Sequence, residues 1–206
     1  MATFSHTLRR NNLTLNAGLL AILLVLLLLA PAEATLGNVV KIVYAHGAAE
    51  RISAYAYLIA GGLGLVQLAL NRAGLASWTR AATETAIVFW LAQFLISLPA
   101  QVMAWGALDW NEPRVIGAVW ILVLTGLVYA VARWIGDTSW MALAAAANAA
   151  IVLVVLRGSI NILHPLNPII GSDSAGIKMF YAAIVLVTGT LAFQLARYLA
   201  GRAANA

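Results

Sequence analysis

The sequence predicts an all-α integral membrane protein, a polytopic bundle of about six transmembrane helices. Hydrophobic residues make up 63% of the 206 residues and charged residues only 9%, whereas about a quarter of the residues in a soluble domain are charged. The mean hydropathy is +0.92. The apolar runs approach the ~20 residues that a helix needs to cross a bilayer, and they lack the period-two alternation of a membrane barrel. We therefore expect residues 1–206 to form a single transmembrane domain in a lipid bilayer.

The first predicted span covers residues 13–30. Arg9 and Arg10 precede it, and Pro31 closes it. A basic start, a leucine-rich centre and the Ala-Glu-Ala run at 32–34 also resemble a secretory signal peptide. We interpret the segment as a retained membrane anchor.

Five further apolar segments complete the predicted bundle. They cover residues 46–70, 81–104, 115–134, 140–156 and 177–199. The longest connection, 157–176, contains Pro165, Pro168 and several glycines. Prolines and glycines at this density predict a structured loop rather than a seventh span.

The positions of the basic residues predict the orientation of the bundle, because cytoplasmic loops carry an excess of Lys and Arg. The side that holds both termini carries seven of the 12 basic residues, namely Arg9, Arg10, Arg72, Arg80, Arg133, Arg197 and Arg202. The opposite side carries the other five, namely Lys41, Arg51, Arg114, Arg157 and Lys178. We therefore expect both termini in the cytoplasm of a bacterium, a location in the inner membrane, and outer loops at 35–45, 105–114 and 157–176.

The composition also excludes several kinds of chemistry. The chain has no Cys, which excludes disulfides, thiolate metal sites, iron–sulfur clusters and covalent attachment of haem. The net charge is +5, but the basic residues lie near helix ends and form no stripe, so nucleic acid is not an expected partner. The sequence offers no nucleophile or acid–base pair arranged for catalysis, and we do not expect an enzyme.

Two histidines are the most informative residues of the chain. His46 lies where the first outer loop enters the second predicted span, and His164 lies in the last outer loop. They are more than 100 residues apart, yet the predicted topology puts both at the same membrane depth. Two neutral imidazoles on opposite faces of a porphyrin form a six-coordinate b-type haem site. The alternative is that each histidine is a polar anchor or a hydrogen-bonded cap at the membrane interface.

The outer loops also supply aromatic and basic residues of the kind that surround a haem. Aromatic walls are available from Tyr44, Trp105, Trp110 and Trp120. Cations for the propionates are available from Lys41, Arg51, Arg114 and Arg157. Glu50 stands four residues after His46, where it could accept the second ring N–H, and Met103 could serve as a substitute ligand. The alternative is interfacial anchoring, since tryptophan belts and snorkelling basic side chains are common at membrane surfaces.

Three segments resemble the haem-handling membrane proteins of cytochrome c maturation, in particular protein C of that system (CcmC). They are Val40-Lys41-Ile42-Val43-Tyr44-Ala45-His46, Trp105-Gly106 with Trp110-Asn111-Glu112-Pro113-Arg114, and Asn161-Ile162-Leu163-His164. The first and third resemble the stretches that carry the family's two haem-ligating histidines, and the second resembles its tryptophan-rich loop. The resemblance implies a six-helix topology and non-covalent haem b held by His46 and His164.

Two functions are consistent with these observations. The resemblance implies a protein of cytochrome c assembly that receives haem b and presents it at the outer face to other membrane or periplasmic subunits. The second loop is poorer in tryptophan than that of the family, with Leu108-Asp109 where further aromatic residues are usual, and this favours an alternative. The alternative is a membrane subunit of a respiratory or photosynthetic redox complex, either a b-type electron carrier or a haem-free anchor. A solute transporter is less well supported, because the sequence shows neither broken helices nor repeated halves.

Overall fold

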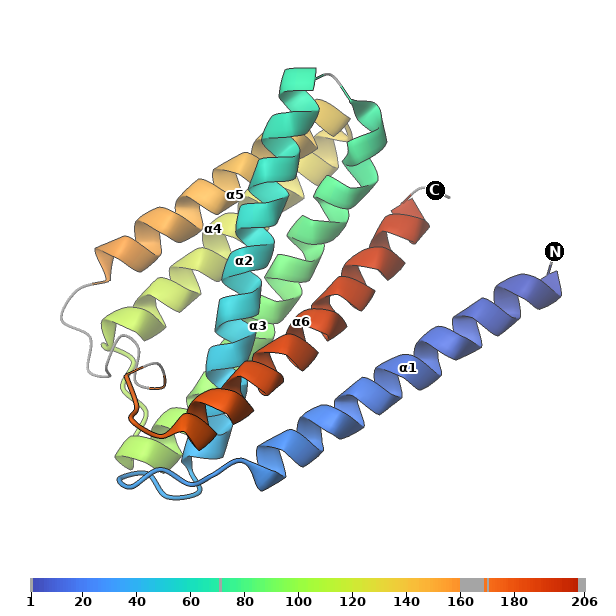
Figure 1. The fold of residues 1–206 in the computed structure, drawn as a ribbon. Helices are drawn as coiled ribbons and strands as arrows, with labels where there is room; N and C mark the ends of the chain where they lie inside the picture. Colours follow the sequence, from blue (N-terminus) through green and yellow to red (C-terminus); the bar gives the residue numbers. More distant parts are fainter. Residues whose placement is uncertain (1, 71, 160–168, 170, 204–206) are drawn as a thin grey trace.

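The computed structural model describes residues 2–70, 72–159, 169 and 171–203, which form six α-helices (Figure 1). The helices are α1 (Ala2–Leu29), α2 (Val40–Leu70), α3 (Ala76–Trp105), α4 (Pro113–Ile135), α5 (Thr138–Gly158) and α6 (Ala175–Ala203), with a short 3-10 helix, η1 (Ala73–Leu75), before α3. Within these residues the chain forms no β-strand, only an isolated bridge between Glu33 and Gly37.

The helices confirm the predicted all-α polytopic membrane bundle. Among the residues described, the five helices α2 to α6 are long and apolar enough to cross a membrane. The apolar part of α1, Leu13–Leu29, is shorter. Each span satisfies its own backbone hydrogen bonds, as a segment surrounded by hydrocarbon must.

Helix α2 lies at the centre of the bundle. It packs against α3, α5 and α6, while α4 packs against α3 and α5. Helix α1 contacts α6 and α2, and it diverges from α6 toward its own N-terminus (Figure 1). The C-termini of α1, α3 and α5 and the N-termini of α2, α4 and α6 share one end of the molecule, which we call the His46 end.

Several helices extend beyond the predicted spans. The second begins at Val40 rather than at residue 46, and the third begins at Ala76 rather than at residue 81. Residues 40–45 contain one charged side chain, Lys41, and the helix continues through them because its ammonium is satisfied by the carbonyl of Leu28. As a consequence, His46 lies in the second turn of α2, and not at the point where the loop enters the helix.

Polar side chains and glycines define the helix ends near the connections. The carboxylate of Glu112 caps α4, with Pro113 in the first turn, and Asp137 caps α5 in the same way. Such caps satisfy backbone N–H groups that have no partner within the helix. Helices α3 and α4 end at Gly106 and Gly136, whose φ angles of +78° and +77° lie in the left-handed region that glycine adopts without strain.

Two glycines allow α2 and α5 to approach closely. A Cβ atom added to Gly61 would lie 2.5 Å from the Cβ of Ala149, and one added to Gly64 would lie 2.4 Å from the carbonyl oxygen of Ala142. Real Cβ atoms essentially never come so close to another heavy atom. The glycines and alanines of these helices therefore pack inside the bundle, as small residues commonly do between transmembrane helices.

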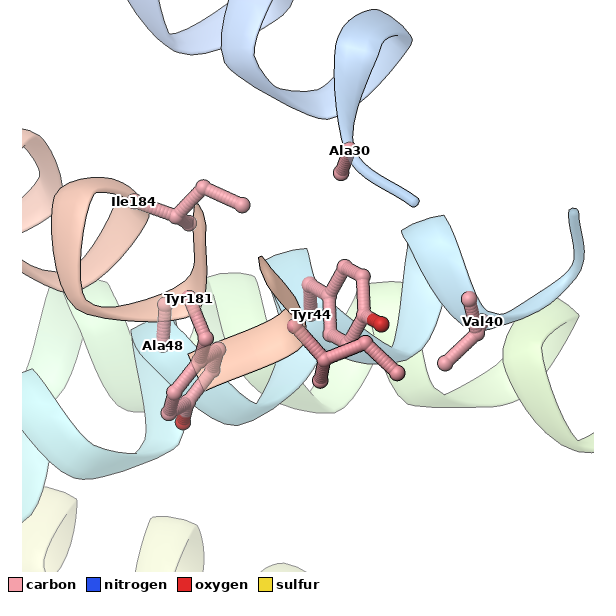
Figure 2. Packing of buried hydrophobic residues seen from close by; sticks show 7 residues of the cluster. Ala30, Val40, Tyr44, Ala48, Tyr181 and Ile184 are labelled. Carbon is pink, nitrogen blue, oxygen red and sulfur yellow. The ribbon is translucent and has the colours of Figure 1, made fainter. Parts of the chain in front are cut away.

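A cluster of buried side chains holds α1, α2 and α6 together at the His46 end (Figure 2). It consists of Ala30, Val40, Tyr44, Ala48, Ile177, Tyr181 and Ile184. The Tyr44 hydroxyl donates to the carbonyl of Pro31 at 3.3 Å, and the Lys41 ammonium donates to the carbonyl of Leu28 at 2.7 Å. These bonds attach the end of α1 to the start of α2.

Several polar side chains inside the bundle are paired with groups on neighbouring helices. Tyr57 and Thr125 share a hydrogen bond of 2.9 Å between α2 and α4. Glu84 of α3 accepts from Arg80 at 2.7 Å and also from the hydroxyl of Tyr129 on α4. Glu84 thus bridges two helices, one of the roles that a lone polar group in a membrane helix can have.

Candidate functional site

A cavity of about 480 Å³ lies at the His46 end, among residues from every helix except α1. Its walls come mainly from α2, α3 and α4, and the linker between α1 and α2 contributes Glu33, Thr35 and Leu36. The end of α5 and the chain that leads into α6 complete it, through Ser159 and Ile169. The volume is within the ~300–1,000 Å³ typical of small-molecule sites.

The orientation of His46 is set by a backbone carbonyl of α3. Its Nδ1 atom lies 3.2 Å from the carbonyl oxygen of Gln93. A neutral imidazole that donates its Nδ1–H to this oxygen carries its lone pair on Nε2. Because His46 lines the cavity, Nε2 is the nitrogen that remains for a ligand there.

The prediction that Glu50 accepts the second ring N–H of His46 is therefore wrong. Glu50 lines the cavity, but its Oε1 atom lies 3.2 Å from Nη1 of Arg114 on α4. The two side chains are 24% and 20% exposed, so the ion pair is partly shielded from water. The carboxylate serves an arginine across the cavity, and the ring N–H of His46 is satisfied by the backbone of Gln93.

Two other carboxylates line the cavity, and each is held by backbone N–H groups. Glu33 accepts from Thr35 and Leu36, both at 2.8 Å. The N–H groups of Leu36 and Thr35 hold the pKa of the Glu33 carboxyl below its usual value. Glu112, only 2% exposed, accepts from the backbone N–H groups of Arg114 at 2.6 Å and Val115 at 3.0 Å.

Two polar atoms at the cavity are buried without a partner in the described part of the chain. They are Oε1 of Gln101 and Nε of Arg114. Gln101 is 7% exposed, and both residues line the cavity. A buried polar atom without a hydrogen bond costs free energy, so such atoms in a cavity wall are suited to contact a bound molecule or water.

Of the predicted site residues, His46, Tyr44, Trp105 and Arg114 line the cavity. Trp90, Gln93 and Gln101 line it as well, and the sequence reasoning did not assign them to a site. A signal for them is present in the sequence. Gln93, Ser97 and Gln101 recur every four residues and so mark one polar face on an otherwise apolar helix.

The structure does not bring Trp110 and Arg51 to the cavity. Trp110 is 56% exposed in the connection between α3 and α4. Arg51 follows Glu50 directly, and a step of one residue turns a helix by about 100°, so its guanidinium lies over the ring of Tyr181 on α6, 5.5 Å from the centroid.

Other residues considered for the haem environment also lie away from the cavity. Met103 and Trp120 are exposed on α3 and α4, Arg157 is exposed at the end of α5, and the ammonium of Lys41 is bound to the Leu28 carbonyl. The side chains of Met103, Trp120 and Arg157 are instead available to lipid and headgroups.

His164 lies in residues 160–168, outside the residues that the structure describes. The chain on both sides of that segment lines the cavity, through Ser159 before it and Ile169 and Ser172 after it. In the described ranges, no group of three or more His, Asp or Glu side chains is placed to hold a metal ion.

The sequence was compared with known protein families and with curated proteins, and neither comparison found a match. The resemblance to the haem-handling proteins of cytochrome c maturation therefore remains an expectation from the three sequence segments.

Proposed function

We propose that this chain is a haem-binding membrane protein of the cytochrome c assembly class, which holds haem b non-covalently between His46 and His164 and presents it to a partner. The observation that carries the proposal is the free Nε2 position of His46 at the wall of a cavity large enough for a small-molecule cofactor. No covalent step on this chain is required for such a role.

The lining of the cavity fits a porphyrin in its chemistry. Trp90, Trp105 and Tyr44 provide aromatic surface, and Arg114 provides a cation that can pair with a propionate. The amide of Gln101 can hydrogen-bond to a polar edge of the ligand. When bound, the haem would supply an iron, for which the neutral imidazoles of His46 and His164 would be suitable ligands.

The covalent chain permits His164 to act as the second ligand. His164 is five residues from Ser159 and five from Ile169, and both of these residues line the cavity. Five extended residues span at most about 18 Å. The length of chain on either side of His164 therefore allows its imidazole to reach the cavity that His46 lines.

Each of these residues would make one contribution to the binding of haem. The Gln93 carbonyl fixes the orientation of the His46 ring, in the way that groups behind a metal-bound histidine generally do. Arg114 orients the acidic edge of the porphyrin. The linker around Glu33, which is attached to the start of α2, covers part of the cavity and limits the access of water.

The proposed location is the inner membrane of a bacterium, with the His46 end on the outer side and both termini in the cytoplasm. The distribution of basic residues in the sequence supports this orientation. Trp105 and Trp110 are exposed at the His46 end, where a membrane or periplasmic partner that accepts haem would dock.

The visible spectrum of the purified protein tests the proposal. We expect a low-spin b-type spectrum in the wild type and its loss in both His46→Ala and His164→Ala, because each variant removes one axial nitrogen. His6→Ala is the matched control and should keep the spectrum. A protein that takes up no haem, or a low-spin spectrum that survives in both variants, would contradict the proposal.

A membrane subunit of a respiratory or photosynthetic redox complex is the second candidate. It is favoured by α1, which packs mainly against α6 and α2 among the described helices and leaves Leu20, Leu24 and Leu28 exposed. Another subunit could cover this surface. Purification in a mild detergent separates the two functions, since a large oxidoreductase would accompany a subunit, whereas haem-accepting assembly factors would accompany a delivery protein.

A further inference from the structure

The charges around the cavity are unequal. Three carboxylates line it, those of Glu33, Glu50 and Glu112, while Arg114 is the one cationic side chain among the described lining residues. A porphyrin with two propionates would bring further negative charge to this wall. The affinity for such a porphyrin therefore depends on how far these carboxylates already neutralise the positive charge of Arg114.

Glu50 differs from the other two carboxylates in what holds it. Glu33 and Glu112 each accept two backbone N–H groups, in the linker turn and at the first turn of α4. The hydrogen bond of Glu50 within the described chain is to Nη1 of Arg114, at 3.2 Å. Glu50 can thus leave the arginine by a change of side-chain rotamer, without disturbing a turn or a helix end.

Arg114 is prepared for a second partner. Its Nε atom is buried and has no hydrogen-bond partner in the described residues, although Nη1 is bound to Glu50. A guanidinium binds a carboxylate best through two parallel N–H bonds, whereas the structure gives Glu50 one bond to one nitrogen. A ligand carboxylate in the cavity can use the arginine more fully than Glu50 does.

We propose that Glu50 is an internal competitor for Arg114, which occupies the arginine in the ligand-free protein and is displaced by a carboxylate of the porphyrin. This inference rests on the proposed function and adds a specificity-determining residue to it. Glu50 weakens the binding of every porphyrin acid that uses Arg114 and leaves a porphyrin without free carboxylates unaffected. The cavity consequently discriminates between acid and ester forms less sharply than an arginine without a competitor would.

The test compares two metal-free probes, protoporphyrin IX and its dimethyl ester, with binding followed by quenching of tryptophan fluorescence in one detergent. Neither probe has an iron, so axial ligation does not enter the result. In Glu50→Gln we expect the acid to bind roughly threefold to tenfold more tightly, as expected for the loss of a partly shielded ion pair, with the ester unchanged. In Arg114→Gln we expect weaker binding of the acid alone.

The double variant, which combines Glu50→Gln and Arg114→Gln, tests whether the two residues act on the same carboxylate of the ligand. We expect it to bind the acid as Arg114→Gln does, since a competitor has no effect once its arginine is gone. Asp173→Asn is the matched control, because it changes the charge by the same amount at an exposed residue before α6 that does not itself line the cavity, although its neighbour Ser172 does. It should bind both probes as the wild type does.

Several results would overturn the inference. They are weaker or unchanged binding of the acid by Glu50→Gln, an equal change for acid and ester, additive effects in the double variant, or no binding of either probe.

If Glu50→Gln does not fold, Glu50→Asp replaces it, because the shorter side chain weakens the pair while keeping the charge, and the acid should again bind more tightly. Tighter binding of the acid by Glu50→Gln, in a protein whose wild type takes up haem without a low-spin spectrum, would support the inference while refuting the proposed haem ligation.

Discussion

At the scale of single residues, a backbone atom positions the most important side chain of the cavity. The imidazole of His46 is aligned by the carbonyl of Gln93, which lies on a different helix. A carbonyl cannot be removed by substitution of the side chain, so the orientation of His46 depends on the packing of α2 against α3 and not on the identity of residue 93. The ion pair of Glu50 and Arg114 likewise joins two helices, α2 and α4, across the cavity.

Glu33 makes the linker turn sensitive to acid. Two backbone N–H groups lower its pKa below the usual 4.5, so the turn is fully stabilised above that pH and loses the stabilisation as the pH falls through the lowered pKa. Hydrogen exchange followed by mass spectrometry should show protection of Thr35 and Leu36 that declines at acidic pH. In Glu33→Gln, which does not titrate, the protection factors should not change with pH. Equal pH dependence in both proteins would contradict this role.

At the scale of helices, hydropathy predicted where spans occur better than where helices begin. The five segments from 46–70 onward correspond to α2 to α6, because long apolar runs identify membrane helices directly. The extra turns, such as the start of α2 at Val40, contain charged side chains, Lys41 in α2 and Arg80 in α3, which lower the local hydropathy without ending the helix. Those turns matter for function, since they place Tyr44 and His46 on a rigid helix at the cavity.

The contact between α2 and α5 depends on the absence of a side chain at residue 64. In Gly64→Ala the new Cβ would meet the backbone carbonyl of Ala142, which cannot move away alone. We expect a loss of stability of about 1–3 kcal/mol, as for other overpacked contacts. Gly62→Ala is the matched control, because a Cβ there meets nothing within 4 Å.

Thermal or denaturant unfolding in detergent measures both glycine variants. Gly62→Ala should be neutral or slightly stabilising, since alanine has the higher helix propensity. If Gly64→Ala were as stable as Gly62→Ala, the close approach of the two helices would be refuted.

At the scale of the whole molecule, the cavity forms where helix ends from distant parts of the sequence converge. Its imidazole, aromatic surface and arginine could be predicted, because His46, Tyr44, Trp105 and Arg114 are conspicuous in an apolar chain. The partners of those residues could not, because helix rotation decides them. One step along α2 separates Glu50, which faces Arg114, from Arg51, which faces Tyr181.

Rescue of a His46→Gly variant by added imidazole tests the central claim most directly. We expect the variant to lose the low-spin haem spectrum and imidazole to restore it, because the free ring can occupy the vacated space and donate to the Gln93 carbonyl. 1-Methylimidazole, which has no N–H to donate, should restore it less effectively. A low-spin spectrum retained by His46→Gly, or one that imidazole fails to restore in the folded variant, would contradict the assignment of His46 as a haem ligand.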